Sequence, residues 1–129
     1  MTKVGLIGAV LYAKDLPRLS EFYAAVAGLP IKESKDEYRV LGCESPLLVV
    51  VKIPSRIAGS IAIETPPVRR QETPIKLVFS VLDIANARKD ASERGGVVDP
   101  PVREWEFDGD TVCDGHDPEG NIFQLRRLD

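Results

Sequence analysis

The sequence is poor in the residues that form disulfide frameworks and metal clusters. Its 129 residues include only two cysteines, one histidine, one tryptophan and one methionine. Cys43 and Cys113 could pair on number alone, but the N-terminus shows no signal-peptide pattern, so we expect reduced thiols in a cytoplasmic protein. We predict two small, half-buried thiols. The alternative is a reactive Cys113, because it lies in a predicted strand near the predicted ligand pocket.

The chain also lacks a surplus of positive charge and a long apolar run. Seventeen lysines and arginines stand against 20 aspartates and glutamates, a net charge of -3, so no basic surface is expected for a nucleic acid. Apolar runs such as residues 47–51 are far shorter than the roughly 20 residues of a membrane-spanning helix. A hydrophobic content of 43% suits one compact soluble domain. Neither nucleic acid nor a membrane is an expected partner.

The first part of the chain follows a strand, helix and three-strand pattern. Residues 4–12 form an apolar run of strand length, and Asp15 is a candidate cap for the following helix. That helix carries apolar residues at helical spacing and ends at Gly28 and Pro30. Further short strands are predicted at residues 31–34, 37–43 and 47–53. Together these elements make one βαβββ unit.

The second part of the chain repeats this pattern after a connection over residues 54–74. Four prolines in the connection argue against a regular helix or a central strand, although one short strand is predicted at residues 60–64. The second unit comprises a helix capped by Asp83 and closed by Gly95-Gly96, and a two-residue hairpin turn at Asp108-Gly109. Its predicted strands cover residues 75–81, 97–98, 102–107, 110–113 and 121–128.

An internal repeat relates the two units at an offset of 68 residues. Asp15 aligns with Asp83, and Gly28 aligns with Gly96. The predicted fold class is therefore α+β: two βαβββ modules that form a cupped, barrel-like mixed sheet with helices outside. We expect a single domain over residues 1–129, with module 1 at about 1–53 and module 2 at 75–129. The concave surface between the modules is the expected place for a ligand.

Several segments resemble one known superfamily. They are residues 8–16, Phe22-Tyr23, Gly28-Leu29 and the turn and strand of residues 117–125, which contains Asp117-Pro118-Glu119-Gly120-Asn121. These segments are similar to the glyoxalase/bleomycin-resistance/dioxygenase proteins, the vicinal oxygen chelate superfamily. The resemblance supports the fold and says little about substrate, because the superfamily includes isomerases, ring-cleaving dioxygenases, epoxide-opening transferases and drug-sequestering proteins.

The resemblance implies four inward positions where many members hold a divalent metal. In this sequence those positions are Gly8, a residue near Val49 or Val51, Lys76 and Gln124. Glycine and valine offer no ligand atom, lysine repels a cation, and only Gln124 keeps an oxygen. We therefore predict no metal site and no cofactor. His116 lies in a turn, where we expect a surface or turn-stabilising role, with metal or acid–base use as the alternative.

Strand alternation indicates what lines the cup instead. If Gly8 and Gln124 face inward, their neighbours two residues away do so as well, and those between them pack against helices. Lys76 then needs a carboxylate such as Glu64, Glu104 or Glu106, or water at the rim, or an anionic ligand. Trp105 either walls the pocket or packs in the core. The predicted ligand-binding residues are Gly8, Val10, Tyr12, Lys76, Ser80, Trp105, Gln124 and Arg126.

Three functions fit these residues. The first is a metal-independent small-molecule binder that resembles bleomycin-resistance proteins, with a ligand that has an anionic group and an apolar body. The second is a glyoxalase-like or dioxygenase-like enzyme, which either uses Lys76 with Tyr12 or Cys113 for proton transfer or recruits a metal through other ligands. The third is a non-enzymatic dimeric interaction domain. The resemblance implies a homodimer, and leaves open whether modules pair within one chain or between two.

Overall fold

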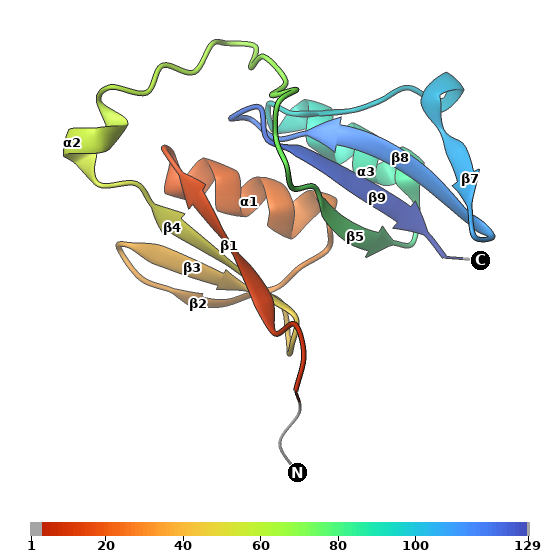
Figure 1. The fold of residues 1–129 in the computed structure, drawn as a ribbon, viewed down its shortest axis with the longest axis horizontal. Coiled ribbons are helices and arrows are strands. Elements are labelled where there is room, and N and C mark those ends of the chain that lie inside the picture. Colours follow the sequence, from red (N-terminus) through yellow and green to blue (C-terminus); the bar gives the residue numbers. More distant parts are fainter. Residues whose placement is uncertain (1–3, 129) are drawn as a thin grey trace.

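The structure is a computed structural model, which describes residues 4–128 (Figure 1). Module 1 consists of β1 (Gly8–Ala13), α1 (Leu16–Val26), β2 (Ile31–Ser34), β3 (Tyr38–Leu41) and β4 (Leu47–Lys52). Its strands form the first sheet in the order β1-β4-β3-β2, with β1 and β4 parallel and the other pairs antiparallel. This is the predicted βαβββ unit.

Module 2 repeats that topology and adds one strand. It contains β5 (Leu77–Val81), α3 (Ile84–Glu93), β6 (Val97–Val98), the short 3-10 helix η1 (Pro101–Arg103), β7 (Trp105–Phe107), β8 (Asp110–His116) and β9 (Ile122–Arg127). The second sheet has the order β5-β9-β8-β6, and β7 also pairs with β8. The two mixed sheets with their helices confirm the predicted α+β fold class.

The helix starts follow the repeat, whereas the helix ends differ by one residue. Asp15 and Asp83 both cap helices, each accepting a backbone hydrogen bond of 3.1 Å from the residue three positions on. At the two helix ends, the glycines with positive φ are Gly28 (67°) and Gly95 (85°). The predicted match of Gly28 with Gly96 is therefore wrong by one position, because α3 has 10 residues and α1 has 11. A side chain at Gly96 would instead collide with the Phe22 ring.

The connection differs from its prediction at residues 60–64. It contains the single-turn helix α2 (Ser55–Ala58), and residues 60–64 belong to no strand. The backbone N–H groups of Ser60 and Ile61 donate to Ile57 and Ala58, which continues the helical turn. The chain then arches over the upper side of the molecule in Figure 1, away from the sheets. The predicted short strand is wrong because the segment has no strand beside it.

One hydrophobic core joins the two modules. Helices α1 and α3 contact each other, and the Phe22 and Tyr23 rings of α1 each lie 5.8 Å from the Phe123 ring of β9. Phe123 and Leu125 are fully buried on the covered face of the second sheet, as the alternation predicts. Ile7 was expected to pack against a helix, but 69% of it is exposed, because β1 begins only at Gly8.

No helix within residues 4–128 has the length and apolar content needed to cross a membrane.

Candidate functional site

The predicted pocket residues of module 1 lie on the exposed face of the first sheet. Gly8, Val10 and Tyr12 stand opposite Leu47, Val49 and Val51 in the parallel β1–β4 pair. Both candidate valines therefore face the same way as Gly8, because opposite residues share a face of the sheet. Val10 and Tyr12 are 57% and 63% exposed. This face, which we call the apolar face, carries mainly hydrophobic side chains.

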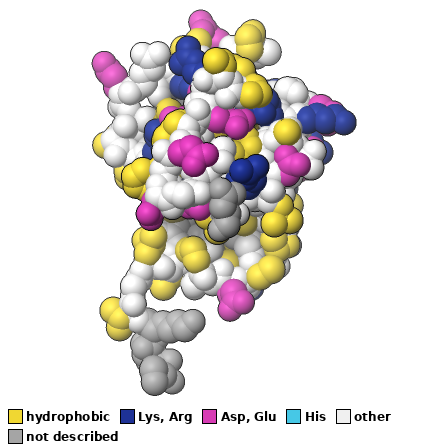
Figure 2. All heavy atoms as spheres, turned by 90° about the vertical axis from the view of Figure 1, so that its right-hand side faces the viewer, with side chains coloured by type: hydrophobic (Ala, Val, Ile, Leu, Met, Phe, Trp, Pro, Cys, Tyr) yellow, Lys and Arg dark blue, Asp and Glu magenta, His cyan; other side chains and the backbone are white. Residues whose placement is uncertain are grey.

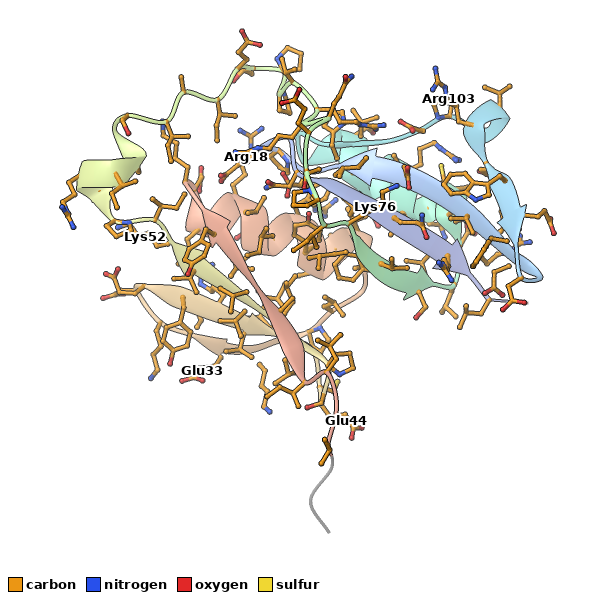
Figure 3. All side chains as sticks on the ribbon, viewed as in Figure 1. Arg18, Glu33, Glu44, Lys52, Lys76 and Arg103 are labelled. Carbon is orange, nitrogen blue, oxygen red and sulfur yellow. The ribbon has the colours of Figure 1, made fainter. Side chains whose placement is uncertain are left out.

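The predicted residues of module 2 lie on the exposed face of the second sheet. The strand register places Ser80, Arg126 and Trp105 in one row across β5, β9, β8 and β7. The neighbouring row contains Val78, Gln124 and Asp114. Lys76 directly precedes β5, and its side chain reaches the same face (Figure 3). We call this surface the polar face.

A continuous set of contacts crosses the polar face. Lys76 Nζ donates to Asp114 Oδ2 at 2.9 Å, and Gln124 Nε2 donates to Asp114 Oδ1 at 3.4 Å. Arg126 Nε donates to Gln124 Oε1 at 3.0 Å. The Arg126 guanidinium carbon lies 4.9 Å from the centre of the Phe107 ring, within cation–π range. Lys76, Asp114, Gln124 and Arg126 form the polar row.

Asp114 was missed because the strand containing it was predicted to end at Cys113. It provides the carboxylate for Lys76 that was expected among three glutamates. Glu104 instead pairs with Arg88 at 2.5 Å, and Glu106 is opposite Thr111 on the other face of the sheet. Extending the strand by one residue would have placed Asp114 on the face opposite to that of Cys113, and in the structure Asp114 stands opposite Gln124.

Cys113 lies on the covered face of β8. It is opposite Leu125 and is fully buried, and its Sγ donates to the Asp99 carbonyl at 3.3 Å. Burial raises the pKa of this thiol. Cys113 is therefore separated from Lys76 by the sheet, so its predicted place beside the pocket is wrong. Cys43 is exposed, so neither cysteine is half-buried.

A groove of about 660 Å³ runs between the edge strands of the two sheets. Gly8, Lys76 and Ser80 line it, together with apolar residues that include Leu6, Leu47 and Phe79. Among the described residues, the other five predicted pocket residues do not belong to this lining. The structure thus brings three predicted residues into one groove and leaves the others on the two exposed faces.

Gly8 is held to glycine by a close backbone approach. A Cβ atom at this position would lie 2.3 Å from the carbonyl oxygen of Leu47 on β4. Real Cβ atoms do not tolerate that separation, so any side chain requires the strands to move. The first of the four family metal positions therefore has no room for a ligand side chain.

The remaining metal positions do not fit a divalent cation either. Val49 and Val51 provide no donor atom, and the Lys76 ammonium reaches the same Asp114 carboxylate that contacts Gln124. Within residues 4–128, no three His, Cys, Asp or Glu side chains gather where they could hold a metal ion. A divalent ion usually takes at least three protein ligands. The residues at these four positions do not fit the divalent metal that the resemblance implies.

The turn that contains Asp117 connects the two modules through hydrogen bonds. Asp117 is fully buried and accepts hydrogen bonds from the Tyr23 hydroxyl at 2.7 Å, from the Glu119 backbone at 2.8 Å and from the Asn121 backbone at 3.0 Å. Burial raises the pKa of both Asp117 and Tyr23. Glu119 accepts the backbone N–H groups of Lys14 and Asp15, each at 2.8 Å. The motif that resembles the superfamily therefore connects the end of module 2 to the start of α1.

His116 holds the connection in place. Its Nδ1 accepts a hydrogen bond of 2.9 Å from Arg69 Nε, and the same guanidinium pairs with Asp99 at 2.6 Å. Burial and the Arg69 charge lower the pKa of His116. A neutral histidine is required to accept this bond. The contacts support a stabilising role, but His116 is the last residue of β8 and its bond is to the connection, so its predicted place in a turn is wrong.

Solved structures with low sequence identity share this fold. An enzyme of the glyoxalase/bleomycin resistance protein/dioxygenase family from Burkholderia phytofirmans PsJN is 16% identical, with a TM-score of 0.69 over 98% of this chain and 100% of that one. A glyoxalase-related enzyme from Fulvimarina pelagi is 16% identical, with a TM-score of 0.65 over 98% and 88%. A mutant glyoxalase I from Zea mays gives 0.66 at 16% identity, over 95% of this chain and 45% of that one.

Sequence comparison identifies the family directly. A search of curated proteins found no match. A family profile described as the glyoxalase-like domain, however, matches residues 8–126, which is nearly the whole chain. The fold, the two βαβββ modules and this match agree, and the chain belongs to the glyoxalase-like domain family of the glyoxalase/bleomycin resistance/dioxygenase superfamily.

Proposed function

We propose that this protein is a metal-independent binder of small molecules that carry an anionic group on an apolar body. The observation that supports it best is the Arg126 guanidinium on the polar face. Its Nε donates to Gln124, and its guanidinium carbon lies 4.9 Å from the centre of the Phe107 ring. Among the described residues, no carboxylate forms an ion pair with it. Arg126 is thus the cation of the polar row that remains for an anionic ligand.

The rest of the polar face suits the apolar part of such a ligand. Trp105 and Phe107 are 40% and 53% exposed and share one face of β7. Large aromatic side chains offer both contact area and stacking, and water covers them poorly. Lys76 is already paired with Asp114. The ligand carboxylate, sulfonate or phosphate would therefore bind Arg126, and its ring system would lie against the two aromatics.

Binding is favoured over the enzyme alternative. Of the groups considered for proton transfer, Lys76 is engaged by Asp114, and Cys113 lies behind the sheet. Tyr12 belongs to the other exposed face. These groups do not converge within the chain on one reacting atom, which general acid–base catalysis requires. A binding role needs no such convergence.

A homodimer forms part of the proposal. The apolar face leaves Val10 and Tyr12 exposed, and Figure 2 shows that the lower part of the molecule carries hydrophobic and uncharged side chains with few charges. An exposed apolar surface of this kind favours a protein partner. A second copy that places its polar face against this apolar face would enclose a ligand between two chains. The proposed setting is the cytoplasm.

The binding proposal can be tested with 8-anilinonaphthalene-1-sulfonate, a fluorescent probe with one anionic group and an aromatic body. We expect saturable binding, weakened about tenfold or more by Arg126→Gln, because a hydrogen bond to a charged group contributes roughly 1.5–3 kcal/mol. The matched control is Arg127→Gln, since Arg127 is the next residue on β9 and contacts Thr111 instead. Equal affinities for the two variants would reject the site.

Two further measurements test the dimer and the absence of metal. Val10→Asp should convert a dimer to a monomer in sedimentation velocity, whereas Leu82→Asp, at a residue that is 98% exposed, should leave the dimer intact. A wild-type monomer at working concentration would contradict the dimer. Elemental analysis of the purified protein should find no stoichiometric metal, and bound zinc, nickel or iron would contradict metal independence.

A further inference from the structure

A second hollow lies away from the polar face and the apolar face, at the start of α1. Its volume is about 660 Å³. The start of α1, the turn between β2 and β3, residues 63–67 of the connection and the Pro118-Glu119 turn surround it. None of the eight predicted ligand-binding residues lines it. We propose that this hollow binds the phosphate group of a small molecule, at a site separate from the polar face.

Four cationic side chains in this hollow form no ion pair with any described carboxylate. They are Arg18, Lys35, Arg39 and Lys52. The protein as a whole has a net charge of -3, so this concentration of unpaired cations is a local feature. Figure 3 shows Arg18 and Lys52 beneath the arch of the connection.

Two of the four carboxylates that line the hollow accept backbone hydrogen bonds. Asp15 accepts the backbone N–H of Arg18, and Glu119 accepts two backbone N–H groups. Lys14, a fifth cation, donates its Nζ to the carbonyl of Ile61. Asp36 and Glu64 remain as lining carboxylates. The lining as a whole therefore holds five cations and four carboxylates, a formal excess of one positive charge. None of the five cations has an ion-pair partner among the described residues.

Arg39 is the side chain whose position most requires an acceptor. It is opposite Val50 on β4, so it lies on the face of the first sheet that α1 covers. Its Nε is buried and makes no hydrogen bond within the described part of the chain. Lys52 projects from the same face, since it is opposite the buried Ala13. A buried guanidinium nitrogen without an acceptor is unfavourable, and an anion held by this guanidinium offsets that cost.

The chemistry of these donors favours a phosphate group. Near neutral pH a phosphate monoester carries a charge of about -1.5 to -2 and presents three strong acceptor oxygens. Arginine binds phosphate through two parallel hydrogen bonds, and lysine adds a point charge. The N-terminal end of the 11-residue helix α1 contributes a positive dipole. Arg18 lies against Gly95, where any side chain would collide with its guanidinium.

The experiment uses inorganic phosphate and pyrophosphate as probes, titrated at low ionic strength into the full chain and followed by ¹H–¹⁵N NMR. We expect saturable shifts at the backbone amides of residues 14–16, 18 and 34–39, and about tenfold weaker binding in Arg39→Gln and in Lys52→Met. Lys89→Met, an exposed change on α3 outside the hollow, is the control and should bind as the wild type does.

The proposal is overturned if neither probe saturates in the wild-type protein, or if both variants bind with unchanged affinity. Equal weakening by Lys89→Met would also overturn it, because the effect would then reflect net charge alone. If Arg39→Gln fails to fold, Lys52→Met decides the outcome, because Lys52 is the last residue of its strand. Arg126→Gln should leave phosphate binding in this hollow unchanged, so the phosphate titration is independent of ligand binding on the polar face.

Discussion

The two modules share one topology but present opposite chemistry on their exposed faces. The apolar face of module 1 is built from Val10, Tyr12, Val49 and Val51, and its first family metal position is a glycine closed off by the neighbouring strand. The polar face of module 2 joins four side chains in one row. The repeat therefore keeps one backbone topology while the side chains of the two exposed faces differ, and only the proposed function assigns a protein partner to one face and a ligand to the other.

The largest loss of stability should come from removing the Asp117 carboxylate, which lies where module 2 meets α1 of module 1. Asp117→Ala leaves the buried Tyr23 hydroxyl and two backbone N–H groups without their acceptor. We expect a loss of about 3–5 kcal/mol in the free energy of unfolding, measured with urea, because buried polar groups are left unpaired. Asp90→Asn, at an exposed position on α3, should cost less than about 0.5 kcal/mol. Equal losses of unfolding free energy in the two variants would contradict a stabilising role for the buried hydrogen bonds of Asp117.

The next largest loss of stability should come from adding a methyl group at Gly8, on the apolar face. Gly8→Ala places a Cβ atom 2.3 Å from the Leu47 carbonyl oxygen, so β1 and β4 must separate. We expect about 2 kcal/mol or more of destabilisation by thermal or urea unfolding. Gly59→Ala is the matched control, because its Cβ would meet only Ser55 at 3.5 Å. That change should be neutral or slightly stabilising, and a neutral Gly8→Ala would show that the strand spacing is wider.

The connection between the modules should make stability depend on pH through His116. Its folded-state pKa is lowered, first by burial and then by Arg69. The unfolded chain therefore binds more protons than the folded one near the ordinary histidine pKa of about 6.5, and stability rises with pH in that window. Stability that is present above this value is lost as pH falls through the lowered folded-state pKa. Urea midpoints between about pH 8 and pH 5 measure the loss.

His116→Gln is the comparison for the pH experiment, since glutamine accepts a hydrogen bond without titrating. The variant should show a flatter pH profile in the same window. An identical slope in both proteins would assign the pH dependence to other groups. This experiment tests whether module 2 and the connection act together, because the Arg69 guanidinium contacts both His116 and Asp99.

The smallest expected effect on stability comes from the ion pair between Lys76 and Asp114 on the polar face. Asp114→Asn removes the partner of Lys76 in a pair with 37% and 19% of the two side chains exposed. Solvent screens such pairs, so we expect a change below about 1 kcal/mol in unfolding. Binding of the anionic probe should increase about threefold, since a carboxylate no longer opposes it. Weaker probe binding would instead show that Asp114 positions the ligand site through Gln124.

Much of the fold was predictable from local signals. Asp15 and Asp83 marked two helix starts, alternation placed Phe123 and Leu125 in the core, and Asp108-Gly109 formed the hairpin turn, with positive φ at both residues. These features depend on interactions within a few residues of the chain. The βαβββ repeat followed from the same signals, because hydrophobic periodicity and turn residues suffice to order elements along a sequence.

The contacts of the site were less predictable because they join distant residues. Lys76 and Asp114 are 38 positions apart, and Arg69 and His116 are 47 apart. Such contacts depend on the register between strands, which the sequence alone does not give. Asp114 was left out because its strand was predicted to end at Cys113. The groove between β1 and β5 and the hollow beside α1 arise from the packing of two modules, which single-strand patterns do not encode.

The bond between Glu119 and the start of α1 has a consequence for how the chain is made. Glu119 contacts backbone groups that precede it by 105 and 104 residues. During synthesis, the first helix emerges from the ribosome long before the acceptor for these two N–H groups exists. The entry turn of module 1 therefore lacks these two contacts until nearly the entire polypeptide has been made, although the Asp15 cap of α1 needs only its neighbours in sequence.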